Sequence, residues 1–189
     1  MAKSAAAPKV DVAERLEPLA GRMFAENGVA AKPAPAAVRI ALRANAPGIK
    51  EAKKVLGFDL PAKPKISASK GERIALWIGP DEWLVIDAEE SGIAAAFAKL
   101  GNANLSAVDV SHRNTAILLE GDVAHLVLSS GCPLDLSLAA FPVGACARTI
   151  LSKSEIVLHR EANDRFRVEC WRSFSDYVWK FLVDSIKSV

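Results

Sequence analysis

Hydrophobic and polar residues alternate along much of the chain after residue 37, and this alternation predicts most of its strands. Residues 38–43 read VRIALR, with large apolar side chains at every second position, which is the period of a half-buried strand. Strands are predicted on the same ground at residues 38–43, 73–78, 83–87, 107–110, 114–120, 148–151, 156–159 and 166–170. Pro80 is the second residue of the segment 79–82, which indicates a type I turn there.

Apolar residues at helical spacing predict four helices. The first three each end at a glycine, which is typical of helix C-termini. Asp122 is a candidate N-cap for the third helix, and Ser175 or Asp176 for the fourth. The helices are expected at residues 48–56, 93–100, 122–130 and about 175–186.

The order of these elements indicates an α+β protein. Each half of the chain follows roughly the order β-α-β-β-α, which is typical of ferredoxin-like folds. We therefore predict two ferredoxin-like β-α-β-β-α halves, at about residues 38–111 and 112–189. Their sheets should be mainly antiparallel, with helices packed on them.

Residues 1–37 differ in composition from the rest, being rich in Ala and Pro. Leu16, Leu19 and Met23 have helical spacing, but Pro18 makes a helix there weak. We predict a flexible N-terminal arm over residues 1–37. The alternative is an arm that orders against a partner.

The predicted hairpin at residues 73–87 is apolar on both faces, so both faces need cover. Helices of the same half could cover one face, and the other half or another protein would cover the second. The first face carries Ile74, Leu76, Ile78, Leu84 and Ile86, and the second carries Ala75, Trp77, Trp83 and Val85.

Composition and charge narrow the class of protein. The chain is 51% hydrophobic and 24% charged, which is ordinary for a globular protein. No apolar run approaches the ~20 residues of a membrane span, and we expect no signal peptide. The net charge of +2 is spread along the chain, so neither nucleic acid nor a membrane is an expected partner. The odd number of cysteines, three without a CxxC pair, favours reduced thiols and a cytoplasmic location.

Candidate catalytic residues are few. Asp109, Ser111 and His112 are close in sequence, but strand alternation places His112 on the opposite face, which argues against a triad. His125 and His159 have no second ligand at helical spacing, and no glycine-rich phosphate loop occurs. We predict no catalytic, cofactor-binding or metal-binding residue, and therefore an accessory subunit of a larger enzyme.

The last helix has two apolar stripes. One stripe suits the chain's own core and consists of Phe174, Val178, Phe181 and Leu182. The second is either buried too or faces a partner. Our candidate partner interface is this second stripe, Trp179, Val183 and Ile186, followed by Trp77 and Trp83.

Five segments resemble the gamma subunit family of heterotetrameric sarcosine oxidase. They appear in order and at plausible spacing over residues 38–189. They are residues 77–85 (WIGPDEWLV), 108–113 (VDVSHR), 131–136 (GCPLDL), 141–142 with 148–149 (FP, RT), and 172–174 (RSF).

This resemblance implies a function. Such a complex oxidises sarcosine to glycine with oxygen, produces hydrogen peroxide and, with tetrahydrofolate, forms 5,10-methylenetetrahydrofolate. FAD, FMN, NAD and the folate site belong to the alpha and beta subunits, and zinc belongs to the delta subunit. The gamma subunit packs against alpha and resembles in fold the folate-binding domain of aminomethyltransferases. No catalytic residue of the family maps onto this chain.

One alternative function comes from the same fold. A free-standing folate-binding or one-carbon transfer protein of the aminomethyltransferase type would need a carboxylate in a pocket to hold the pterin. Asp81 or Asp109 could supply it, but a turn explains Asp81 and an exposed strand face explains Asp109.

Overall fold

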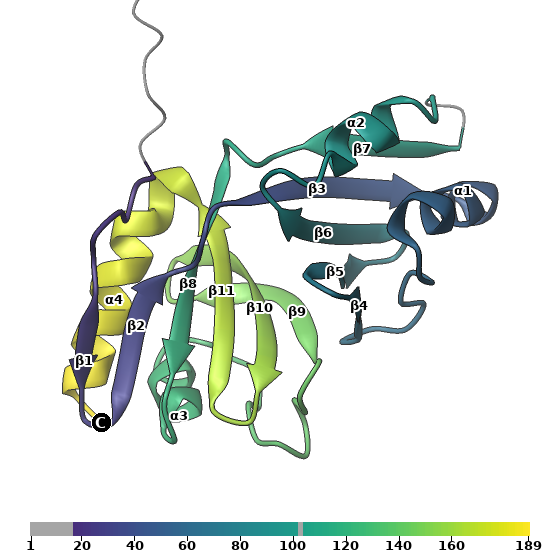
Figure 1. Cartoon of the computed structure of the whole chain (residues 1–189). Coiled ribbons are helices and arrows are strands. Elements are labelled where there is room, and N and C mark those ends of the chain that lie inside the picture. Colours follow the sequence, from purple (N-terminus) through teal and green to yellow (C-terminus); the bar gives the residue numbers. More distant parts are fainter. Residues whose placement is uncertain (1–16, 102–103) are drawn as a thin grey trace, which may run out of the picture.

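The protein consists of two antiparallel sheets that pack face to face, with helices on their outer sides (Figure 1). The structure is a computed structural model and describes residues 17–101 and 104–189. The six-stranded sheet has the order β1 (Phe24–Glu26), β2 (Val29–Pro33), β8 (Asn114–Glu120), β11 (Arg165–Trp171), β10 (Ser154–Ala162) and β9 (Cys146–Leu151). The five-stranded sheet has the order β4 (Ser67–Lys70), β5 (Arg73–Gly79), β6 (Glu82–Ala88), β3 (Ala37–Ala44) and β7 (Leu105–Asp109).

The two halves share one topology. The helices are α1 (Ala46–Leu56), α2 (Ile93–Ala98), α3 (Ala124–Ser129) and α4 (Ser175–Lys187), the last preceded by a 3-10 turn, η1 (Arg172–Phe174). The strand order β3-β6-β5-β4 in the first half matches β8-β11-β10-β9 in the second. The α+β prediction is confirmed. The first half contains one strand more than predicted, β4, whose sequence SASK lacks the large apolar residues that mark a strand.

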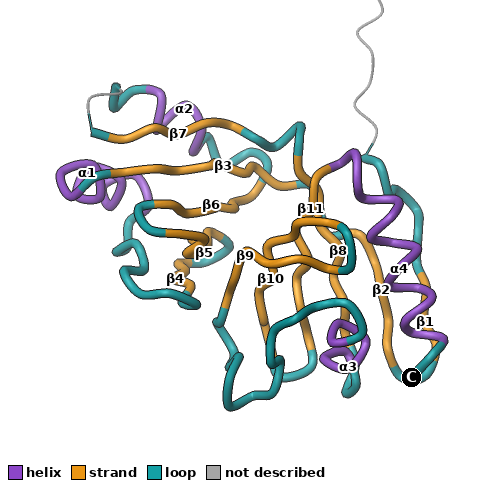
Figure 2. The backbone as a smooth tube through the Cα atoms, turned by 180° about the vertical axis from the view of Figure 1, so that it is seen from behind, coloured by secondary structure: helices purple, strands orange, loops and turns teal. Residues whose placement is uncertain are grey.

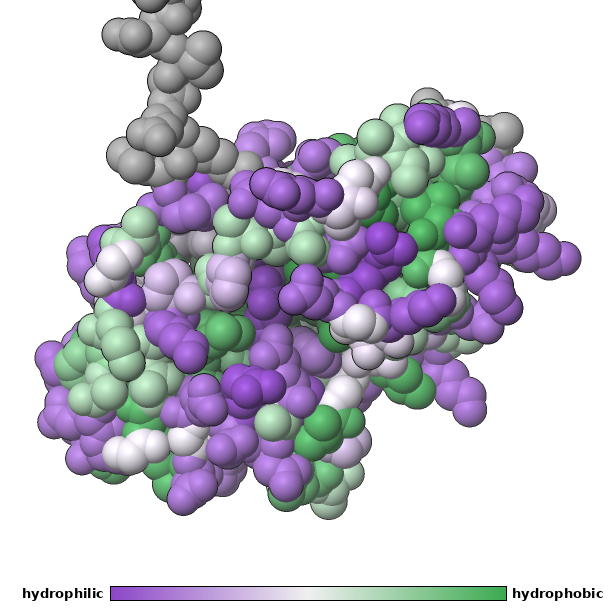
Figure 3. Space-filling model, in the orientation of Figure 1, coloured by the Kyte–Doolittle hydropathy of each residue, from purple (hydrophilic) through white to green (hydrophobic). Residues whose placement is uncertain are grey.

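Three hydrophobic clusters hold these layers together. One lies between the five-stranded sheet and α1 and α2, and another between the six-stranded sheet and α3 and α4. The third joins the sheets, where Leu76, Leu84 and Ile86 pack against Cys146 and Val157 of the other half. Both faces of the β5–β6 hairpin are therefore covered within this chain. On the surface, Figure 3 shows apolar residues gathered at the end that holds the five-stranded sheet.

Residues 17–37 differ from the predicted flexible arm. They include β1 and β2, and β2 pairs with β8 over residues 30–33. Leu19, Val29 and Ala31 are buried in the cluster beneath α4. Residues 18–21 form a turn, not part of a helix, while Leu16 lies outside the described residues. β2 was not predicted because alanine occupies both a buried and a partly exposed position in it. The sequence therefore shows no alternation of large apolar and polar residues there.

The turn at residues 79–82 and the N-termini of three helices also differ in detail from the prediction. Asp81 has a φ of +56°, which excludes a type I turn and matches the third position of a type II turn. The first helix is capped by Asn45, whose side chain accepts a hydrogen bond from Gly48 N at 3.0 Å. Asp122 and Asp176 cap no helix, and Ser175 Oγ instead donates to Arg172 O at 2.8 Å.

Candidate functional site

Exposed aromatic side chains gather where β11 passes into α4. Trp171 and Phe174 are 39% and 41% exposed, and their rings meet edge to face with centroids 6.1 Å apart. The Arg113 guanidinium lies 4.7 Å from the centre of the Trp171 ring. We call Arg113, Trp171 and Phe174 the aromatic rim. Exposed Trp and Arg side chains of this kind are typical of protein–protein interface centres.

Strand pairing creates the aromatic rim from distant segments. Trp171 pairs with Asn114 of β8 at the end of the β8–β11 ladder. Arg172 N donates to Arg113 O at 2.8 Å, which brings the connection before β8 against the start of η1. This group was not predicted from the sequence, and the assignment of Phe174 to the chain's own core was wrong because its side chain is exposed. Arg113 and residues 172–174 nevertheless lie in the segments that carry the family resemblance.

A cleft of about 190 Å³ opens between the two sheets beside the aromatic rim. Two residues of the rim, Arg113 and Trp171, also line this cleft. Apolar residues of both halves, including Leu84 and Val157, form part of its lining. Glu82 pairs with Arg148 of the other half and with Arg43. Apolar side chains and paired charges at one cleft are suited to docking a protein segment.

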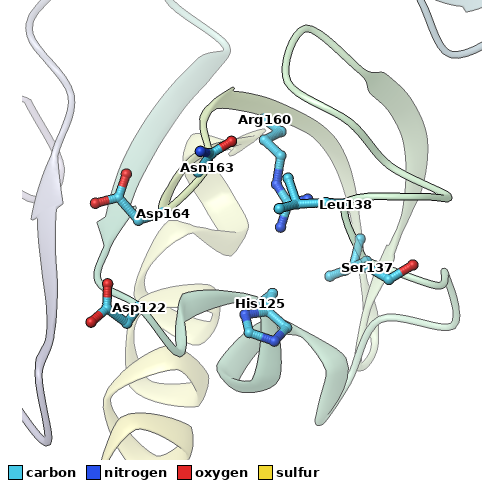
Figure 4. A pocket seen from close by; sticks show the side chains of 8 residues that line it. Asp122, His125, Ser137, Leu138, Arg160, Asn163 and Asp164 are labelled. Carbon is cyan, nitrogen blue, oxygen red and sulfur yellow. The ribbon is translucent and has the colours of Figure 1, made fainter.

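A second pocket, of about 380 Å³, lies between α3 and the β10–β11 hairpin (Figure 4). Its lining includes Asp122 and His125 at the start of α3, and Asp164 of the hairpin. Arg160 reaches the pocket from β10 although only 2% of the residue is exposed. Alternation in residues 156–160 places Arg160 on the core face with Ile156 and Leu158, a sequence signal that we did not use.

The α4 residues that were predicted to face a partner pack against the chain's own core instead. Trp179 and Ile186 are buried in the cluster beneath α4, and Val183 packs against it. The reason is that β1 and β2 extend the sheet under this helix, as Figure 2 shows from behind. The second stripe therefore belongs to the chain's own core, which corrects the partner assignment.

Trp77 and Trp83 also face the interior. Trp83 is 3% exposed, and its Nε1 donates to Pro61 O at 2.8 Å. Trp77 is partly buried and packs at two of the hydrophobic clusters. Neither is available as a main interface anchor.

The Asp109–Ser111–His112 segment forms no triad. Ser111 donates from both its N–H, at 2.9 Å, and its hydroxyl, at 2.5 Å, to Asp109 Oδ1. Ser111 Oγ also accepts from Arg39 N at 2.9 Å, so it extends the pairing of β3 with the end of β7 in the five-stranded sheet. His112 is exposed.

His159 is the one histidine among the described residues that is fully buried. Ser67 Oγ donates to Gly144 O at 2.6 Å, so the 3.3 Å contact between Ser67 Oγ and His159 Nε2 uses the Nε2 proton. Burial, with the nearby Arg167 charge, lowers the pKa of His159 to about 4. The imidazole is therefore neutral near pH 7 and has a structural role.

The three cysteines are buried and free. Burial raises the pKa of the Cys146 and Cys170 thiols to about 12, so neither is a ready nucleophile. Within residues 17–101 and 104–189, no group of three or more His, Cys, Asp or Glu is placed to hold a metal ion. In the same described ranges, no helix is long and apolar enough to cross a bilayer.

Comparison with known proteins agrees with the sequence segments. A family profile described as "Sarcosine oxidase, gamma subunit family" matches residues 39–188. The chain belongs to this family. The aromatic rim and the inter-sheet cleft both lie within the matched region.

Similar members of this family are known by name. A sarcosine oxidase subunit gamma from Corynebacterium sp. (strain P-1) is 32% identical over 133 residues, which are 69% of this chain and 66% of that protein. One from Arthrobacter sp is 34% identical over the same shares. The matched region thus spans just under two thirds of the length of these relatives.

Two solved structures resemble this fold. A chain of the heterotetrameric sarcosine oxidase from Corynebacterium sp. U-96, in complex with pyrrole 2-carboxylate, has a TM-score of 0.82 and 26% identity, with 92% of this chain and 95% of that chain covered. The glycine cleavage system aminomethyltransferase T from Bartonella henselae has a TM-score of 0.60 and 16% identity, with 84% of this chain and 46% of that chain covered. The second likeness shows the fold alone.

Proposed function

We propose that this chain is the non-catalytic gamma subunit of a heterotetrameric sarcosine oxidase. The observation that carries the proposal is the match over 95% of a chain of such a complex, with a TM-score of 0.82. The complex would oxidise sarcosine to glycine, with hydrogen peroxide and 5,10-methylenetetrahydrofolate as further products. FAD, FMN, NAD, tetrahydrofolate and zinc would be bound by the other subunits. The buried free cysteines support a reducing, cytoplasmic location.

The states of the candidate chemical groups support an accessory role. Ser111 and Asp109 bond to each other, and His159 is kept neutral by burial. The thiols of Cys146 and Cys170 are kept protonated by burial. Because these groups are bonded to one another or kept uncharged, we infer that the oxidation takes place on other subunits.

The alpha subunit is the proposed direct partner, and it would dock on the aromatic rim and the adjacent cleft. Trp171 and Phe174 are large, exposed and in mutual contact, so covering them would remove much apolar surface from water. The cleft beside them could accept a side chain of the partner, with Arg148 and Glu82 at its wall. Beta and delta would join through the assembled complex.

Co-expression of the chain with the alpha, beta and delta subunits tests this proposal. The double variant Trp171→Ala/Phe174→Ala should lose assembly, because truncating an interface anchor costs ~2 kcal/mol or more of binding. Its own thermal melting should stay near the wild-type value, since both side chains are exposed. Leu126→Ala, which removes an exposed side chain on α3, is the control. Assembly of the double variant at wild-type yield would contradict the proposed surface.

The structure supports the alternative function, a free-standing folate-binding protein, less well than the subunit role. Asp81 borders a surface hollow of about 400 Å³ that has no aromatic side chain in its lining to stack on a pterin. Asp109 Oδ1 already accepts hydrogen bonds from Ser111. Titration of the purified chain with tetrahydrofolate separates the two functions. Saturable binding that Asp81→Asn or Asp109→Asn abolishes would favour the alternative.

A further inference from the structure

Arg160 is a buried cation for which the described part of the chain supplies no buried counter-charge. Its Nη1 donates to Phe141 O at 2.7 Å, and its guanidinium lies 4.4 Å from the centre of the Phe166 ring. Its Nε is buried and has no hydrogen-bond partner among the described residues, and no described carboxylate forms an ion pair with it. Burial lowers the pKa of this guanidinium below its usual value. A buried charge in this state is costly.

The uncompensated guanidinium faces the pocket of Figure 4. The figure shows Arg160 reaching the centre of the pocket, with Asp122 and Asp164 together on one side. Both carboxylates are exposed, and neither pairs with a cation in the described part of the chain. The pocket, about 380 Å³, thus presents one positive group at its base and two negative groups at its edge.

The backbone holds these groups in place. Gly121 N donates to Asp164 O at 2.9 Å, which ties the β10–β11 hairpin to the start of α3 beside Asp122. Gly121 has a φ of +146°, and a Cβ there would lie 2.1 Å from Gly28 O, so only glycine suits this close approach. On the other side, Phe141 N bonds to Ser137 O at 2.8 Å, and this loop also positions the carbonyl that binds Arg160.

The charges select the class of ligand. A guanidinium with unused donors matches a carboxylate, which it can bind through two parallel hydrogen bonds. A simple anion would also meet the repulsion of Asp122 and Asp164, whereas a ligand that carries an ammonium group would be attracted by them. We propose that this pocket binds a small zwitterionic amino acid, with its carboxylate at Arg160 and its ammonium group toward Asp122 and Asp164. The site is separate from the aromatic rim, and the proposal does not depend on assembly with other subunits.

Calorimetric titration of the full-length chain, without other subunits, tests this site. Glycine and N-methylglycine are the probes, and acetate and methylammonium are half-ligands that carry one charge each. Glycine or N-methylglycine should bind at one site per chain, and each half-ligand should bind at least about tenfold more weakly, because it loses one charged hydrogen-bonding group.

Variants assign the binding to the pocket. Asp122→Asn/Asp164→Asn should weaken amino-acid binding about tenfold or more, while the exposed pair Glu26→Gln/Glu90→Gln removes the same charge elsewhere and should change nothing. Arg160→Met should abolish binding. If Arg160→Met does not fold, the affinity of Asp122→Asn/Asp164→Asn for the amino acid still tests the proposed site. No saturable binding at millimolar concentrations, equal binding of acetate, or unchanged affinity in Asp122→Asn/Asp164→Asn would overturn the proposal.

Discussion

The Arg39 guanidinium joins the two sheets through Glu169, with Arg39 Nε 2.6 Å from Glu169 Oε2. The residues are 3% and 1% exposed and 130 positions apart in the chain. Arg167 Nε lies 2.7 Å from the other carboxylate oxygen of Glu169. A single buried carboxylate therefore compensates two arginines at the contact between the halves.

Replacing this carboxylate should destabilise the fold. Glu169→Gln leaves the Arg39 charge buried without compensation, and breaking a buried pair in this way costs ~3–5 kcal/mol. Urea unfolding followed by tryptophan fluorescence would measure the loss. Glu155→Gln, at an exposed position on the neighbouring strand β10, is the control and should change the free energy of unfolding little. A Glu169→Gln variant as stable as wild type would mean that the pair is not needed to hold the sheets together.

Trp179→Ala should destabilise the free chain. Trp179 is 8% exposed and packs in the cluster beneath α4, and truncating a buried aromatic costs ~3–5 kcal/mol. Phe174→Ala, at the residue directly before α4, is a matched control because Phe174 is exposed and its loss should leave stability nearly unchanged. Thermal melting of both variants checks this. A higher melting temperature for Trp179→Ala than for Phe174→Ala would contradict the assignment of Trp179 to the core.

The stability of the fold should fall as the pH drops below about 6.5. The pKa of His159 is about 4 in the folded chain and close to 6.5 when unfolded, so the unfolded state binds the proton more strongly. The stability that neutral His159 provides is present above pH 6.5 and decreases down to about pH 4, by about 3 kcal/mol at most. His159→Gln should reduce this slope. Measurements of unfolding free energy at pH 7 and near pH 4.5 for both proteins compare the slopes, and equal slopes would exclude His159 as the cause.

The cysteines should resist thiol reagents while the chain is folded. All three are buried, and the pKa of Cys146 and of Cys170 is about 12, so little thiolate forms at pH 8. A chromogenic disulfide reagent should react slowly with the native protein and quickly with all three thiols in denaturant. Rapid labelling of a cysteine in the native protein at pH 8 would show that this thiol is accessible.

Strand positions were readable from the sequence where large apolar side chains alternate. The strand β8 was predicted with the bounds that the structure has, and β3, β5 and β6 nearly so. The strands β1, β2 and β4 were missed. In β2 and β4 the reason is that alanine and serine have no strong preference that distinguishes a strand from a loop. The likeness of residues 39–188 to the gamma subunit family was also readable, because it rests on short segments in order.

The sequence by itself determined the local elements, the α+β class and the need to cover both faces of the β5–β6 hairpin. Only the tertiary structure decided which side chains remain at the surface. Trp179 is covered because β1 and β2 are brought under α4 from the other end of the chain, while Trp171, on β11, stays exposed. Likewise, Arg39 forms an ion pair with Glu169, whereas Arg160 pairs with no carboxylate of residues 17–101 or 104–189. Periodicity reports which side of an element a residue occupies, but exposure and charge compensation depend on what distant segments place against that side.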